Sequence, residues 1–172
     1  MQDYGTLELI AELAVAVLGF SGVVVVLGQR STDEWSELER IRFRGMITTA
    51  SIVLALSLLP APLVSAEMEG SRVWFWSSVA GGLIALAGPI SSLAHSRRAR
   101  LWSNPQVNKV SLVYGFASAY SAPALLFLNA SGVLFGPVFT PFLIAVLILF
   151  GAAILSFVRL LSDAFTTPRS AV

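Results

Sequence analysis

The sequence contains no cysteine and a single histidine, His95. Without cysteine the chain cannot form disulfides, thiolate zinc sites or iron–sulfur clusters, and it has no thiol nucleophile. One histidine cannot supply a histidine-based metal site or the axial pair that holds haem between helices. We therefore expect no metal site and no cofactor.

Charged residues are also scarce. They make up 12% of the 172 residues, against the roughly 25% that is typical of a soluble domain. Hydrophobic residues make up 56%, and the mean hydropathy is +0.79. This composition excludes an ordinary soluble protein and predicts an integral membrane protein whose first partner is the lipid bilayer. A formal net charge of +1 gives no reason to expect a nucleic-acid partner.

Catalytic sequence motifs are absent as well. The chain has no P-loop, no Gly-rich dinucleotide fingerprint, no G-x-S-x-G nucleophile elbow and no H-E-x-x-H zinc motif. Hydrolysis inside a membrane needs a nucleophile with a base, or paired acids on different helices. Glu8 and Glu12 belong to the same expected span, and no other expected span contains an acid. We therefore expect no enzymatic activity.

Long uncharged runs, by contrast, are abundant. Four of them occur, at residues 13–29, 45–66, 73–94 and 110–158. A bilayer core about 30 Å thick needs roughly 20 apolar residues in a helix. The last run would extend for about 74 Å as one helix, so it must hold two spans. The turn formers Asn129 to Gly132 and Gly136-Pro137 mark the division between them.

The sequence thus predicts an all-α integral membrane protein with five transmembrane helices in one membrane domain, residues 1–172. Ser31-Thr-Asp-Glu34 has the spacing of a capping box, which predicts a short cytoplasmic helix at about 33–44 before the second span. The five spans are expected at about 8–28, 46–65, 73–94, 110–129 and 138–159.

Basic residues are distributed unevenly between the two sides of such a bundle. With five alternating spans, ten Lys and Arg residues fall on one side and only Arg72 on the other. The positive-inside rule then places the N-terminus outside and the C-terminus in the cytoplasm. The excess of Arg over Lys suggests a multi-pass protein of a bacterial inner membrane. The cluster Arg97, Arg98 and Arg100 is expected to attract anionic lipid headgroups.

One face of the first span has an ordered chemistry, which we call the first-span stripe. It is acidic at the outer end, small and apolar in the middle and basic at the inner end. At 100° per residue its intramembrane members lie within about 40° of one line, and the last member continues it into the inner loop. The stripe consists of Glu8, Glu12, Val15, Gly19, Gly22, Val26 and Arg30.

The first-span stripe allows three interpretations. In the leading one, several copies form a homo-oligomeric ion channel, in which Glu8 and Glu12 bind inorganic cations and Val15 and Val26 form a constriction. Alternatively, Gly19 and Gly22 form a seam against another helix, and the chain is a non-catalytic accessory or scaffold subunit that binds a membrane protein partner. A third interpretation is a proton-coupled transporter that uses Glu12.

Glycine and proline also occur inside two later spans. Gly81-Gly82 and Gly88-Pro89 lie in the third span, and Ala122-Pro123 lies in the fourth. Breaks at these positions would free backbone carbonyls that could bind an ion. The alternative, which we favour, is that they permit close helix packing and a proline kink.

Overall fold

The structure is a computed structural model of the 172-residue chain and describes residues 2–27, 37–68, 70–98, 109–133 and 136–166. Within these ranges every regular element is a helix and no strand occurs, which confirms the all-α prediction. The helices are α1 (Gln2–Leu27), α2 (Glu37–Leu58), α3 (Pro60–Ser65), α4 (Ser71–Arg98), α5 (Lys109–Ser131) and α6 (Phe139–Thr166).

Four stretches of the described helices are long and apolar enough to cross a membrane. They are Tyr4–Val23 in α1, Arg40–Ser65 in α2 and α3, Ser71–Ile90 in α4 and Phe139–Ser162 in α6. The chain is therefore a multi-pass membrane protein by the length and composition of its helices. α5, with 23 residues, is not among these stretches of the described residues.

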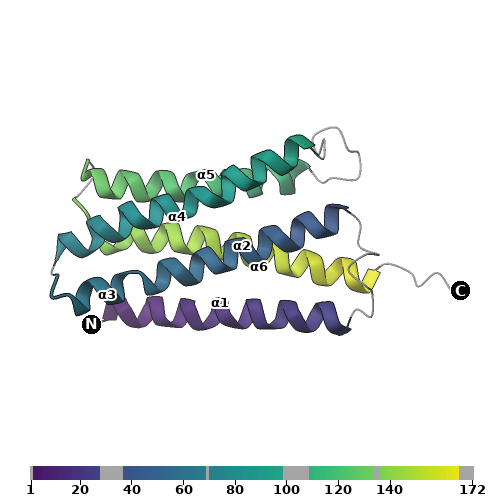
Figure 1. Cartoon of the computed structure of the whole chain (residues 1–172), viewed down its shortest axis with the longest axis horizontal. Helices are drawn as coiled ribbons and strands as arrows, with labels where there is room; N and C mark the ends of the chain where they lie inside the picture. Colours follow the sequence, from purple (N-terminus) through teal and green to yellow (C-terminus); the bar gives the residue numbers. More distant parts are fainter. Residues whose placement is uncertain (1, 28–36, 69, 99–108, 134–135, 167–172) are drawn as a thin grey trace, which may run out of the picture.

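The five long helices run side by side along the longest axis of the molecule, in alternating directions (Figure 1). α1, α2 and α6 lie together on one side, and α4 pairs with α5 on the other. α6 joins the two groups, because it contacts α1, α2, α4 and α5. We call the end where α1, α4 and α6 begin the first end, and the end where α2 and α5 begin the Arg-rich end.

The turns between helices follow the local sequence. Gly132 and Gly136, with φ of 69° and 79°, divide the long apolar run into α5 and α6 as predicted. α2, however, continues through Gly45, so residues 37–44 of the expected short helix form the start of α2 and residues 33–36 lie outside the described residues. A single glycine costs about 1 kcal/mol in a helix but leaves the backbone hydrogen bonds in place.

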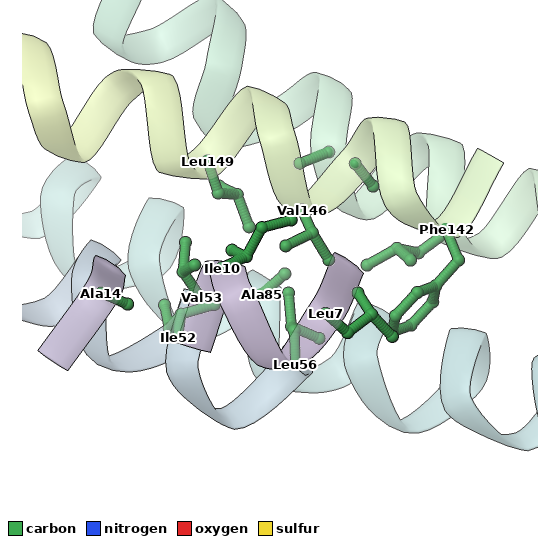
Figure 2. Packing of buried hydrophobic residues seen from close by; sticks show 13 residues of the cluster. Leu7, Ile10, Ala14, Ile52, Val53, Leu56, Ala85, Phe142, Val146 and Leu149 are labelled. Carbon is green, nitrogen blue, oxygen red and sulfur yellow. The ribbon is translucent and has the colours of Figure 1, made fainter. Parts of the chain in front are cut away.

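The hydrophobic core is centred on Gly81 of α4. A methyl group added to Gly81 would lie 2.6 Å from Cδ2 of Leu56, 3.6 Å from Cδ1 of Leu126 and 3.6 Å from Cε2 of Phe142. α2, α5 and α6 therefore meet the α4 backbone at this one level. Figure 2 shows how Leu56 and Phe142 continue into the contacts of Val146 and Leu7, which attach α1 to the same core.

The glycines and prolines of α4 and α5 do not interrupt these helices. α4 is continuous through Gly81-Gly82 and Pro89, and α5 is continuous through Pro123. Gly82 faces the ring of Phe127, whose Cζ would lie 2.8 Å from an added methyl group. The close-packing interpretation of these residues is therefore the one that the structure supports, and the broken-helix interpretation is not.

Candidate functional site

The described part of the first-span stripe lies on the outside of the molecule. α1 turns its other face to α2 and α6 and buries Leu7, Ile10, Ala11, Ala14 and Ser21 there. All members of the stripe whose exposure is described are exposed: Glu8, Glu12, Val15, Gly19 and Gly22. The side chain of Val26 and the whole of Arg30 lie outside the described residues.

Gly19 and Gly22 face open space. A methyl group added to either glycine would meet no other described atom within 4 Å. The seam that these glycines could form is thus not used by any described helix of the same chain. Whatever covers it is lipid, another copy of the chain or another protein.

Glu12 lies well inside the first apolar stretch. It follows Tyr4 by eight residues, which is about 12 Å along a helix. Its neighbours Leu9 and Leu13 are exposed apolar side chains. Within the described residues neither Glu8 nor Glu12 has a hydrogen bond or ion pair. A charged side chain in hydrocarbon costs about 3 kcal/mol or more at the membrane centre, so Glu12 needs water or a polar partner beside it.

An aromatic cluster anchors α1 at the first end. The ring of Trp74 lies 5.8 Å from Tyr4, 5.1 Å from Phe139 and 5.7 Å from Phe142, measured between ring centroids. The position of Trp74 and Trp76 at the outer end of the third expected span predicts that both are interface anchors. Only Trp76 is exposed, since Trp74 is half-buried and joins α1, α4 and α6. This contact holds the α1 turn that carries Glu8 against the bundle.

Asn129 is the polar side chain whose role the sequence did not reveal. It is buried, and its Nδ2 donates to Ser78 Oγ at 2.8 Å and to the Val138 carbonyl at 3.0 Å. Its Oδ1 accepts a hydrogen bond from the Val138 backbone N–H at 3.1 Å. Asn129 therefore ties α4 and α5 to the start of α6, and its amide is not available to an ion.

Two buried hydroxyl groups have no described partner, Ser57 Oγ on α2 and Ser77 Oγ on α4. One hydroxyl on each helix does not make a cation site, because hard cations require several oxygen ligands. In addition, the described residues contain no group of three or more histidine or acidic side chains that could hold a metal ion. The first-span stripe therefore remains the candidate site, because Glu12 needs water or a polar partner within an apolar stretch.

The described charges are divided between the two ends of the bundle. The first end carries Glu8, Glu67 and the single cation Arg72. The Arg-rich end carries Arg40, Arg42 and Arg44 on α2 and Arg159 on α6. Arg97 and Arg98 belong to the last turn of α4, but their side chains are not described and Arg100 lies outside the described residues. Their expected contact with lipid headgroups stays a prediction.

No protein-family model, no curated protein and no solved structure matches this chain. Only the residues of the chain itself therefore bear on its function.

Proposed function

We propose that the protein is a small homo-oligomeric cation channel of a bacterial inner membrane. Each copy has five spans, with the N-terminus outside and the C-terminus in the cytoplasm. The α1 helices of several copies surround the axis. Glu8 and Glu12 form the outer cation site, Gly19 and Gly22 allow the helices to approach closely, and Val15 and Val26 line the narrow section.

The observation that carries the proposal is the exposure of Glu12 on a membrane-spanning helix. A carboxylate at this depth is unfavourable against lipid, but it is favourable beside a hydrated axis. A ring of copies supplies that axis, since the stripe faces away from the rest of its own chain. Carboxylate rings are also a usual means of attracting cations to a pore.

The packing inside one copy supports conduction between copies rather than through a single one. Leu56, Leu126 and Phe142 are fully buried around Gly81, and the other members of this described cluster are apolar. The residues of this cluster give an ion no polar lining. The polar face of α1 is the alternative route.

The division of charge supports the orientation, and the length of α5 supports the fifth span. A helix of 23 residues measures about 35 Å, which exceeds the thickness of the bilayer core. α5 also packs along α4 and α6, two helices with qualifying apolar stretches.

The Arg-rich end, with four described arginines, fits the cytoplasmic side.

The first test counts subunits and then measures ion selectivity. The native mass of the protein in lipid nanodiscs is expected to correspond to a closed ring of several copies. A monomer would overturn the pore. Reconstituted into planar bilayers under a salt gradient, the wild-type protein is expected to give a reversal potential of cation-selective sign.

Glu12→Gln is expected to move that reversal potential to zero or to the anion-selective sign, because the variant removes the charge at nearly constant shape. Glu67→Gln is the matched control, since Glu67 is an exposed acid at the same end of the bundle but off the stripe. Unchanged selectivity in Glu12→Gln would contradict the assignment, as would an equal change in Glu67→Gln.

One observation favours the accessory-subunit interpretation as a second candidate. The open space beside Gly19 and Gly22 would also accept a helix of a different membrane protein. In that case the native complex contains a second protein in fixed ratio, and Glu12→Gln weakens the complex instead of altering a current. A flux that depends on pH and is lost in the same variant would instead favour proton-coupled transport.

A further inference from the structure

A line of polar side chains lies on the outer face of α2 at the Arg-rich end. It consists of Arg40, Arg44, Thr48 and Ser51, spaced four, four and three residues apart, so that all four share one helical face. All four are exposed. Beyond them the same face ends in the exposed apolar side chain of Leu58. The face therefore changes from cationic to hydroxyl-bearing to apolar along α2.

Arg44 is the free cation of this line. No described residue forms a hydrogen bond or ion pair with it. Its positions three and four residues away hold Arg40, Ile41, Ile47 and Thr48, so no acid can pair with it along the helix. Arg40 lies one turn further out on the same face and has an interaction of its own.

The depth of Arg44 matches the lipid phosphates. Arg44 in α2 and Ser65 at the end of α3 lie near the two ends of the apolar stretch Arg40–Ser65 and are 21 residues apart, which gives a helical rise of at most about 32 Å. A hydrocarbon core about 30 Å thick thus places Arg44 in one headgroup layer if Ser65 lies in the other. Thr48 is then about 6 Å deeper, at the level of the glycerol esters.

The hydroxyl groups of Thr48 and Ser51 differ from most others in the described helices. Serine and threonine in membrane helices satisfy their hydroxyls on the carbonyl one turn back, as Thr49 does on Gly45 at 2.8 Å and Ser156 does on Ala152 at 2.8 Å. Thr48 and Ser51 have no such bond and no other described partner. Two exposed hydroxyl groups without a described partner thus lie on the same face as an arginine without a described partner. This arrangement favours binding of a polar ligand at the membrane surface.

We propose that this face of α2 binds an anionic phospholipid of the leaflet at the Arg-rich end. Arg44 holds the phosphate by charge-assisted hydrogen bonds. Thr48 donates to an ester carbonyl, and an acyl chain lies along the apolar remainder of the face toward Leu58. The site is independent of the oligomer and of any conduction through it.

The test compares phospholipids retained by the purified protein in native mass spectrometry, with equal amounts of phosphatidylglycerol and phosphatidylcholine supplied. The wild-type protein is expected to retain phosphatidylglycerol preferentially. Arg44→Gln is expected to lower this preference about five-fold, which corresponds to roughly 1 kcal/mol for one basic residue at the surface. Thr48→Val is expected to lower retention about two-fold, because one neutral hydrogen bond is lost.

Two matched controls come from the same chain. Arg72→Gln removes an exposed arginine at the first end, and Thr49→Val removes a hydroxyl that is already bonded within the helix. Both are expected to retain lipid as the wild type does, and Arg44→Lys is expected to keep most of the preference. Equal losses in Arg72→Gln and Arg44→Gln would overturn the proposal, as would a wild-type protein without preference for phosphatidylglycerol.

Discussion

Two pairs of glycines in apolar helices have opposite surroundings in this protein. Gly81 and Gly82 of α4 are buried, and an added methyl group at either would lie within 3 Å of a neighbouring side chain. Gly19 and Gly22 of α1 are exposed, and a methyl group added to either would meet no other described atom within 4 Å. The first pair lets helices of one chain pack closely. No described helix of the chain packs against the second pair.

The two pairs of glycines differ in whether another helix of the same chain packs against them. Small residues in membrane helices favour close approach of another helix in both settings. In α4 that helix belongs to the same chain, so the glycines contribute to the stability of the fold. In α1 no described helix of the chain fills this place, which is why the proposed contact with another copy or another protein uses these glycines.

The largest expected effect is that of Gly81→Ala. The new methyl group would lie 2.6 Å from Cδ2 of Leu56, a side chain that is fully buried among the other helices. Overpacking of this kind costs about 1–3 kcal/mol, and we expect a value near the upper limit for the free energy of unfolding, measured in detergent. Gly82→Ala is the control, because the ring of Phe127 is partly exposed and can shift. Equal losses in the two variants would contradict this account.

Asn129→Ala is expected to destabilise the fold by about 2 kcal/mol. The change removes the hydrogen bonds to Ser78 and Val138, so the buried Ser78 hydroxyl and the part-buried backbone groups of Val138 lose these partners. The same unfolding measurement checks it. Ser131→Ala serves as the control, since that hydroxyl is exposed and bonds only to its own helix. A loss no larger than that of the control would show that the tie to α6 is not needed.

The smallest loss of stability, and the largest effect on assembly, is expected for Gly19→Leu combined with Gly22→Leu. Open space beside both positions accommodates the side chains, so the single chain is not destabilised, and the loss of two helix glycines can only raise its free energy of unfolding. The native mass in nanodiscs is expected to fall toward that of a monomer. Gly115→Leu, at an exposed glycine of α5 with equally open surroundings, is expected to leave the mass unchanged. An intact ring in the double variant would remove α1 from the axis.

Local sequence features predicted the helical segments well. The turn at Gly132 and Gly136 and the end of the second apolar stretch at Ser65 lie close to their expected positions, because turn formers and hydropathy act over a few residues. The described part of the expected short helix and the second span form one continuous helix, since Gly45 alone does not end a helix. The exposure of Glu8 and Glu12 agrees with a site on the outer face of α1, while cation binding there remains a prediction.

The positions that local features could not predict depend on contacts between distant segments. Trp74 has the sequence setting of an interface residue, yet it packs on Tyr4, Phe139 and Phe142. Asn129 has the setting of a turn residue, yet it bonds to Ser78, 51 residues earlier in the chain. Both residues lie where three helices meet, and no periodicity within one helix encodes which helices those are.

The sequence by itself determined that the chain is all-helical and membrane-embedded, and it showed where basic residues gather. These properties follow from composition and from hydropathy along the chain, which need no knowledge of neighbours. Only the tertiary structure decided which glycines are covered and that α1 presents its acidic stripe outward. The reason is physical: a helix that is apolar on nearly every side can bury any of its faces, and the packing of the other helices selects one.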